Sequence, residues 1–236
     1  MEFEVCLDHV DTAIYAGKKG AKRVELCGAL SDEGLTPSYG MIKACVEKCA
    51  SEVYVMIRPV AGGFEYSENE LESMEHDIEA VAHAGGHGVV FGILDSNGEV
   101  DHVLNKRLIE KSKSLGLGVT YHRAIDLSKR PVEQVEKLIE LGFDRVLTSG
   151  AEPTVGEGIE TIKEMVKVAK GRIEIMAGCG IDESNVKDYL HSGIDAVHFQ
   201  ARTEVKSPDH KIFMGHRTIT DTAKIDKIVE ILEANK

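Results

Sequence analysis

The stretch Arg23–Pro37, RVELCGALSDEGLTP, joins a short strand, a glycine-punctuated polar loop and the start of a helix. Alternate side chains of a strand point to opposite faces, so two charges and a thiol share one face and two aliphatic side chains the other. The aliphatic face predicts packing against a hydrophobic layer, whereas the charged face would make a poor core. We therefore expect Glu25 and Cys27 to face a polar site.

A second segment near the N-terminus repeats this pattern. Phe3–Asp8 places Glu4 and Cys6 on one face of a strand and apolar side chains on the other. Both strands therefore carry the sequence Glu-x-Cys on their polar face. Two such strands predict neighbours that bring like groups together in one polar site.

The composition excludes several function classes. A chain of 236 residues suits one large α/β domain, and its net charge of -12 argues against a nucleic-acid backbone as the main partner. A few buried arginines could still hold a small anion. No apolar run approaches the roughly 18 residues of a membrane helix, and the acidic start MEFEVCLDHVD lacks the basic region of a signal peptide. We expect a cytoplasmic protein with neither nucleic-acid nor membrane partners.

The chain has five cysteines, which are Cys6, Cys27, Cys45, Cys49 and Cys179. Their odd number and wide spread argue against a disulfide framework, and the absence of a CxxC pair argues against a structural zinc site. We expect reduced thiols. Cys45 and Cys49 are spaced i, i+4 on a predicted helix, which favours a packing role.

Strand and helix patterns alternate along the whole chain. Eight short strands, each followed by a helical segment, predict parallel pairing and a closed (β/α)8 TIM-like barrel that forms a single domain over residues 1–236. An open, doubly wound sheet is the alternative, although no G-x-G-x-x-G follows the first strand. A polar extension at about residues 200–220 precedes the last predicted helix, Asp221–Asn235.

The predicted strands carry charged residues on the face that points away from the helices. This interior set comprises Glu4, Cys6, Arg23, Glu25, Cys27, Tyr54, Met56, Arg58, Thr120, His122, Glu174, Met176 and His198. Unpaired buried charges cost several kcal/mol each. We therefore expect the three glutamates to pair with Arg23, Arg58 and Arg145. A network that only fills the barrel is the alternative for the deeper residues.

Reactive side chains gather at the predicted carboxyl ends of the strands, where barrel enzymes keep their active sites. Glu25 and His122 are candidates for exchanging protons with a substrate, and Arg58 suits a carboxylate or phosphate. These three residues are the candidate catalytic set if the protein is an enzyme. A strand-end histidine that is only hydrogen-bonded is the alternative for His122.

Two loops of small residues follow the sixth and seventh strands. Ser149 and Gly150 lie in one loop and Gly178 and Gly180 in the other. Free backbone amides near the last strands of a barrel often bind phosphate, so these four residues form a candidate anion site. Glycine turns that arise from packing alone are the alternative.

The pair Cys6 and Cys27 is a candidate metal site. Thiolates select Cu(I) over metals that prefer oxygen ligands, and Met56 and His122 are candidate additional ligands. Two buried cysteines that act as small hydrophobic residues are the alternative.

At these residues the sequence resembles the CutC family of copper homeostasis proteins. The resemblance rests on motifs that follow in order from residue 4 to about 202: EVC (Glu4–Cys6), RVELC (Arg23–Cys27), GLTPSYG (Gly34–Gly40), MIRP (Met56–Pro59), GVVFG (Gly88–Gly92), YHRAID (Tyr121–Asp126), RVLTSG (Arg145–Gly150), IMAGCGI (Ile175–Ile181) and VHFQAR (Val197–Arg202). The family more often has Phe at Tyr121, Gly at Cys179 and Ser at Gln200.

The resemblance implies a cytosolic TIM-like barrel that self-associates as a dimer or tetramer and is linked to copper tolerance. It also implies that Cys6 and Cys27 are the Cu(I) ligands. Two functions follow as hypotheses, a Cu(I)-binding protein of copper homeostasis and an enzyme acting on a small phosphorylated or carboxylated metabolite. A third reading is a scaffold whose segment 200–220 serves only subunit contact.

Overall fold

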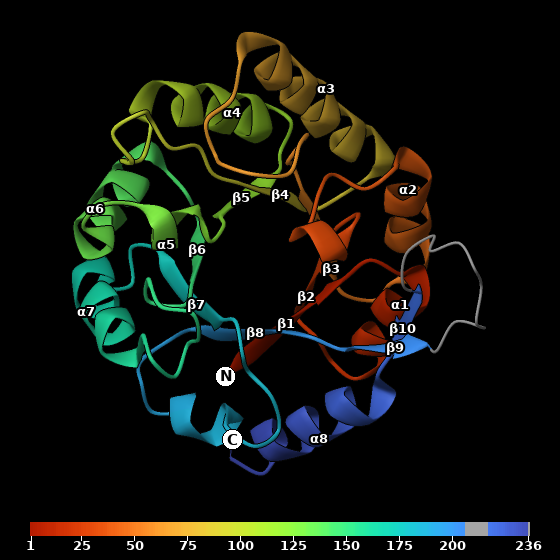
Figure 1. The fold of residues 1–236 in the computed structure, drawn as a ribbon. Coiled ribbons are helices and arrows are strands. Elements are labelled where there is room, and N and C mark those ends of the chain that lie inside the picture. The colour runs from red at the N-terminus through yellow and green to blue at the C-terminus, as the bar shows by residue number, and fades with distance from the viewer. Residues whose placement is uncertain (206–216, 236) are drawn as a thin grey trace, which may run out of the picture.

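The computed structural model describes residues 1–205 and 217–235. Eight parallel strands close into a barrel in chain order: β1 (Glu2–Leu7), β2 (Arg23–Leu26), β3 (Glu52–Met56), β4 (Gly88–Phe91), β5 (Gly118–Tyr121), β6 (Arg145–Thr148), β7 (Glu174–Gly178) and β8 (Ala196–Gln200). Figure 1 shows the helices as an outer ring around these strands. Because β1 pairs with both β2 and β8, the closed barrel is confirmed and the open sheet is excluded.

The outer ring is built from seven helices of nine or more residues: α1 (Val10–Lys18), α2 (Tyr39–Lys48), α3 (Glu68–Ala84), α4 (His102–Ser114), α6 (Pro131–Leu141), α7 (Ile159–Ala169) and α8 (Thr222–Glu233). A capping box between Ser67 and Glu70 begins α3. The sequence offers Thr36 as a cap for α2, but the cap is Ser38, and the Thr36 hydroxyl accepts a hydrogen bond from the Arg58 amide.

Three shorter elements lie in the segments that connect the strands with the next longer element: η1 (Leu30–Asp32), α5 (Ala124–Leu127) and η2 (Val186–Tyr189). The sequence pattern predicts a short helix from Asp182 to about His191, but the structure has only the 3-10 turn η2 there. The same pattern predicts a loop from Arg123 to Arg130, and the structure places the single turn of α5 in it. Both differences occur in short connections, where the helical pattern of the sequence is weakest.

The two faces of the strands divide as their alternation predicts. Val5, Val24, Val53 and Val119 belong to the main hydrophobic core, which lies between the barrel and its helices. A separate cluster inside the barrel contains Cys6, Cys27, Tyr54, Met56 and Val90, together with Leu30 from η1. The prediction of which residues face the helices is thus confirmed.

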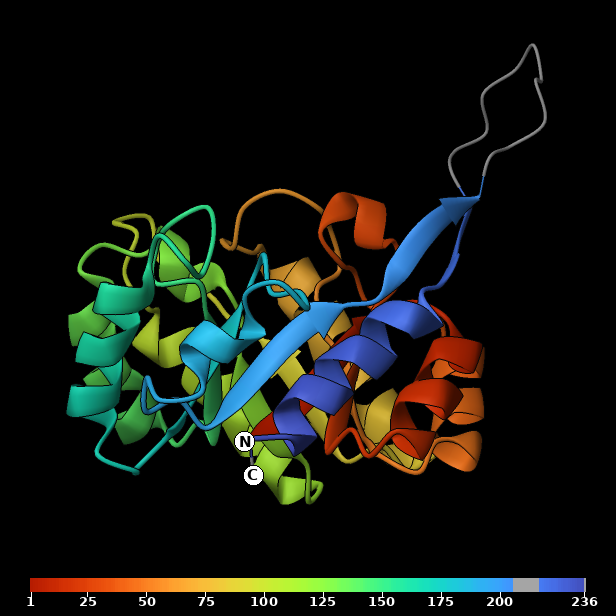
Figure 2. The same ribbon diagram turned by 90° about the horizontal axis from the view of Figure 1, so that it is seen from below.

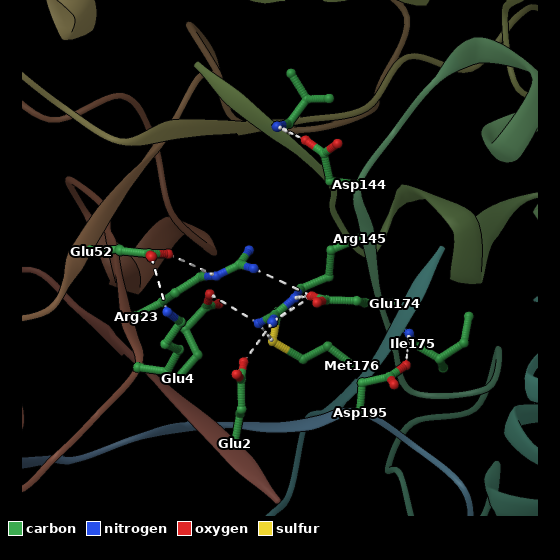
Figure 3. A network of polar contacts seen from close by, with 12 residues as sticks. Glu2, Glu4, Arg23, Glu52, Asp144, Arg145, Glu174, Ile175, Met176 and Asp195 are labelled. Carbon is green, nitrogen blue, oxygen red and sulfur yellow. Dashed lines mark hydrogen bonds and ion pairs between the residues drawn. The ribbon is translucent and has the colours of Figure 1, made fainter. Parts of the chain in front are cut away.

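An ion network fills the amino-terminal half of the barrel, as Figure 3 shows. Arg145 is almost completely buried, and its guanidinium lies 2.6 Å from Glu174 Oε2 and 3.8 Å from Glu4 Oε2. Arg23 also reaches Glu174, at 3.3 Å, and stacks on the ring of Tyr54. Pairing of Glu4 and Glu174 with arginines is confirmed.

The expected ion pairs of Glu25 with an arginine and of Arg58 with a glutamate are wrong. The partner of Glu25 is His198, whose Nε2 lies 3.7 Å from Glu25 Oε2, and the Arg58 guanidinium donates to backbone carbonyls. The prediction paired these residues by charge alone. In the barrel, however, Glu25 and Arg58 lie nearer the carboxyl ends of the strands than Arg23 and Arg145 do.

Two glycines make room for Tyr54 inside the barrel. A Cβ at Gly88 would lie 2.2 Å from Tyr54 Cε1, and a Cβ at Gly118 would lie 2.3 Å from its hydroxyl. These glycines begin β4 and β5, so the tyrosine ring packs directly against the backbone of two neighbouring strands.

The predicted extension after the eighth strand begins and ends as an antiparallel pair, β9 (Arg202–Val205) and β10 (Arg217–Thr220). Figure 2 shows this pair projecting beyond the barrel on the side where η1 lies. Residues 206–216 of the extension lie outside the described residues. Among the described helices, none has the length and apolar character needed to cross a membrane.

Candidate functional site

A cavity of about 560 Å³ opens at the carboxyl ends of the strands. Many of the residues singled out in the sequence line it, among them Cys6, Glu25, Cys27, Arg58, His122 and Gly180. These six come from β1, β2, β3, β5 and β7 or from the residues directly after them. The closed barrel therefore brings the candidate metal pair and the candidate catalytic set into one space.

The two thiols meet because β1 and β2 are neighbours in parallel register. Cys6 lies opposite Glu25, and the Cys27 amide donates to the Leu7 carbonyl one step further on. The sulfur atoms lie 3.9 Å apart, and Cys27 Sγ is 3.8 Å from Glu25 Oε2. Ligand atoms of these three buried side chains all lie within 4.8 Å of one another, so a single metal ion could contact all of them.

Both thiols hold their protons more tightly than free cysteine does. The hydrogen bond with Cys27 and burial raise the pKa of Cys6 well above its usual 9.0. The hydrogen bond with Cys6 lowers the pKa of Cys27, but burial and the Glu25 carboxylate outweigh it and raise that pKa to about 11. At neutral pH the pair is therefore a dithiol, and a metal must displace the protons to bind thiolates.

His198 connects this dithiol to the ion network below it. Its Nδ1 lies 2.9 Å from Glu4 Oε1, and its Nε2 faces Glu25. Burial alone would lower the pKa of His198, but hydrogen bonds with Cys6 and Glu4 and the charge of Glu25 raise it well above 6.5. Sequence reasoning placed His198 in the interior set without giving it a role, because its partners come from strands distant in sequence.

One of the two carboxyl oxygens of Glu25 has no hydrogen-bond partner among the described residues. Its Oε2 lies near Cys27 and His198, whereas its Oε1 is buried without a hydrogen bond among the described residues. Burial raises the pKa of Glu25 above 4.5, and the opposing charge of His198 only partly offsets this effect. An unpaired buried oxygen beside a cavity is a ready acceptor for a ligand.

His122 presents a neutral hydrogen-bond donor to the same cavity. The Ala124 amide donates to its Nδ1 at 3.2 Å, so Nε2 carries the ring proton, and Nε2 has no partner among the described residues. Burial and the neighbouring charge of Arg58 lower the pKa of His122 to about 3. The ring packs 4.6 Å from that of Phe64, and a Cβ at Gly92 would lie 2.8 Å from Nδ1.

Arg58 holds two loops together at the mouth of the cavity. Its guanidinium donates to the carbonyls of Asp32 and Gly34 after β2 and to that of Gly62 after β3, at 2.9–3.1 Å. Its Nε is buried without a partner among the described residues, and Phe64 lies over the guanidinium at 5.2 Å. Most of its donors are thus committed to the loops, while its charge still faces the cavity.

The loop after β6 is organised by Asp126. This carboxylate accepts from the Thr148 hydroxyl, the Ser149 and Ala151 amides and Arg123 Nε. Ser149 is fully buried, and its hydroxyl is within hydrogen-bond distance of Arg123 and of the Glu152 carbonyl. Asp126 therefore orients Arg123 and the loop, not His122.

The four residues of the candidate anion site do not lie together on the cavity. Gly180 lines it, whereas Ser149, Gly150 and Gly178 are not among the lining residues. The Gly150 amide already donates to the Thr148 hydroxyl, and a Cβ at Gly150 would lie 2.2 Å from the Gly158 carbonyl. The first loop is thus shaped by packing, and its amides serve the fold.

Comparisons with known proteins agree with this geometry. The model of the CutC family matches residues 1–203. A CutC family protein of Bacteroides fragilis is 45% identical over 207 residues, with 87% of this chain and 82% of the relative covered. A second, from Histophilus somni, is 42% identical over 94% of this chain and 92% of its own length. A CutC crystal structure from Streptococcus agalactiae superimposes with a TM-score of 0.79 at 33% identity, covering 84% of this chain and 98% of that one.

Proposed function

Since the chain belongs to the CutC family, we propose that it acts in copper homeostasis and binds Cu(I) through Cys6 and Cys27. The observation that carries the proposal is the 3.9 Å separation of the two sulfur atoms at the ends of neighbouring strands, inside a cavity open to solvent. The name of the Streptococcus agalactiae relative links that protein to copper homeostasis.

The chemistry of the pair suits a soft cation. Two thiolates favour Cu(I), and both cysteines are buried at the base of the cavity. Glu25 lies within reach as a third donor, and the cationic His198 beside Cys6 would balance the negative charge of a copper bis-thiolate. Zinc is the other metal that thiolates select, so it belongs in the same test.

We further propose a cytoplasmic location and self-association. All five cysteines are free, which suits a compartment that keeps thiols reduced. The projecting pair β9–β10 exposes Val205 and Ile219, and an isolated two-stranded hairpin is marginally stable in water. Contact between subunits through this pair would bury both side chains.

The test is a Cu(I) competition titration against a colorimetric chelator under anaerobic conditions. The wild type is expected to bind one Cu(I) per chain, and Cys6→Ser combined with Cys27→Ser is expected to lose this site. Cys49→Ser is the matched control, because Cys49 lies at the end of α2, away from the cavity, and its thiol forms hydrogen bonds with the backbone of Ala13 and Ser51. Unchanged Cu(I) affinity in the double variant, or a clear preference for Zn(II), would contradict the proposal.

A second function is favoured by a separate observation. The cavity has the volume of a small-molecule site, far more than one ion needs, and two of its buried polar atoms, Glu25 Oε1 and His122 Nε2, lack partners among the described residues. We propose as the alternative an enzyme that acts on a small anionic metabolite, with Arg58 supplying positive charge and Glu25 and His122 in acid–base roles.

A thermal-shift screen with sugar phosphates and small carboxylates tests this alternative. Stabilisation that disappears in His122→Ala but persists when both cysteines are replaced by serine would support an organic ligand. No stabilisation by any compound of the library would count against it.

A further inference from the structure

The cavity has a half that the thiols do not occupy, built around the ring of Phe64. This ring lies 4.6 Å from the imidazole of His122 and 5.2 Å from the guanidinium carbon of Arg58, so all three groups form one wall. The aliphatic and thioether side chains of Leu30 and Met56 also line the cavity, and they border the thiols because both belong to the cluster that contains Cys6 and Cys27. A charged group, a neutral donor and an apolar surface thus stand side by side.

The charge on this wall is positive, and Arg58 forms no salt bridge among the residues that the structure describes, although Glu25 and Glu33 line the same cavity. Arg58 is only 5% exposed, and its hydrogen-bond partners are three backbone carbonyls. Carbonyls solvate a guanidinium but carry no full charge, so an anionic group of a ligand would complete its pairing.

The neutral donor is His122 Nε2–H. Because the Ala124 amide occupies Nδ1, this proton can point only into the cavity, where nothing described receives it. A buried N–H without an acceptor is costly, and an oxygen of a ligand would satisfy it. Its neutrality favours an uncharged oxygen, such as a carbonyl or hydroxyl, next to the anionic group.

The number of donors that remain on this wall favours a carboxylate over a phosphate, although Arg123 and Lys224 line the cavity elsewhere. Three hydrogen bonds of the Arg58 guanidinium are already committed, and the amides of Ser149 and Gly150 serve Asp126 and Thr148. A phosphate dianion needs many donors, whereas a carboxylate has two oxygens and one charge.

From these contacts we propose that the cavity binds a small 2-oxo or 2-hydroxy acid, with its carboxylate toward Arg58 and its 2-oxygen on His122 Nε2. A short aliphatic tail would lie against Leu30 and Met56. The proposal rests on the second function given above, the binding of an anionic metabolite, and it does not use the thiols of Cys6 and Cys27.

The test compares 2-oxobutyrate with butyrate, which has the same carboxylate and tail but no 2-oxygen. Protein carrying ¹⁵N-labelled histidine is titrated with each acid, and the His122 Nε2 resonance and the Kd are recorded. We expect 2-oxobutyrate to bind about tenfold more tightly than butyrate and to shift that resonance. His122→Ala should abolish the difference, and His122→Gln, which keeps an N–H donor at a similar distance from the backbone, should restore part of it.

Equal affinity for the two acids, or no saturable binding of either at millimolar concentrations, would overturn the proposal. Tighter binding of inorganic phosphate than of 2-oxobutyrate would show that the ligand class is wrong. The variant with both Cys6 and Cys27 replaced by serine should still bind 2-oxobutyrate, so failure of the copper proposal and failure of this one give different results. Thermal melts of each variant verify that it is folded.

Discussion

His198 Nδ1 lies 2.9 Å from Glu4 Oε1 in the centre of the barrel, and this contact joins the cavity at one end to the ion network at the other. Glu4 is also 3.8 Å from Arg145, whereas the opposite edge of the imidazole faces Glu25. The dithiol is therefore electrostatically connected to the deepest charges of the fold. A substitution at either end of this chain of contacts should change the electrostatic environment at the other end.

Replacing Glu4 by Gln is expected to destabilise the protein by about 3 kcal/mol at neutral pH, because two buried cations lose their carboxylate. Burial raises the pKa of Glu4, but His198, Arg145 and Arg23 outweigh it and hold that pKa below 4.5. A carboxylate with a depressed pKa stabilises the fold above its unfolded pKa and loses this effect as pH falls through the folded value. The cost of the substitution should therefore shrink below about pH 4.5.

Urea unfolding at several pH values measures this effect. Glu72→Gln on the exposed side of α3 is the matched control and should change stability by less than about 0.5 kcal/mol. A cost for Glu4→Gln that does not change between pH 7 and pH 3 would show that the carboxylate is not the stabilising form.

Cu(I) affinity is expected to rise with pH. Because the pKa of Cys27 is about 11 and that of Cys6 lies well above 9.0, each bound thiolate must release a proton below those values. If both thiols bind, the apparent association constant should increase by up to about 100-fold per pH unit between pH 6 and 8. Competition titrations at fixed ionic strength give the slope, and a flat profile would argue against a bis-thiolate site.

Gly92→Ala is expected to displace His122. The added Cβ would lie 2.8 Å from His122 Nδ1 and 2.9 Å from the Tyr121 ring, so the imidazole must shift or the strand must bend. We expect a loss of about 1–3 kcal/mol in stability and weaker binding of 2-oxobutyrate, with unchanged Cu(I) binding.

Gly63→Ala is the control for this substitution, because a Cβ there meets nothing within 4 Å. It should leave both stability and ligand binding close to the wild type. Equal behaviour of the two alanine variants would mean that Gly92 does not determine the position of the histidine.

Tyr54 and Gly88 are expected to show strong energetic coupling. Gly88→Ala alone would force its Cβ to 2.2 Å from the tyrosine ring and should cost about 2 kcal/mol. In a Tyr54→Ala background the space is free, so the same substitution should cost less than about 0.5 kcal/mol. A double-mutant cycle in urea measures the coupling, and additive costs would contradict the packing arrangement.

Much of the fold is readable from local patterns. The alternation of Val24 and Leu26 with Glu25 and Cys27 predicted which face meets the helices, and the repeat of strand and helix predicted the closed barrel. Periodicity reports burial on one element at a time, so it succeeds wherever a residue's environment follows from its own strand. The helix predicted after β7, from Asp182 to about His191, was wrong, because the segment forms only the 3-10 turn η2 and such a turn leaves little periodic signal.

The partners of the charged residues were predicted only in part. Glu4 and Glu174 pair with arginines as expected, whereas Glu25 pairs with His198 and Arg58 binds carbonyls. Charge alone allows any carboxylate to pair with any arginine, but depth along the barrel decides which groups can touch. That depth depends on the register between strands, which no single segment specifies.

The sequence by itself determined the chemistry that is available: two thiols, a set of acids and basic side chains on the inner strand faces, and motifs that resemble the CutC family. Only the tertiary structure decided which of them meet. Closure of the barrel brings Cys6 beside Cys27 and commits Ser149 and Gly150 to packing. It leaves His122 Nε2 and Glu25 Oε1 in one cavity with no hydrogen-bond partner in the described part of the chain. The physical reason is that hydrogen bonds and packing between distant strands set these distances, and such contacts have no signature within a local stretch of chain.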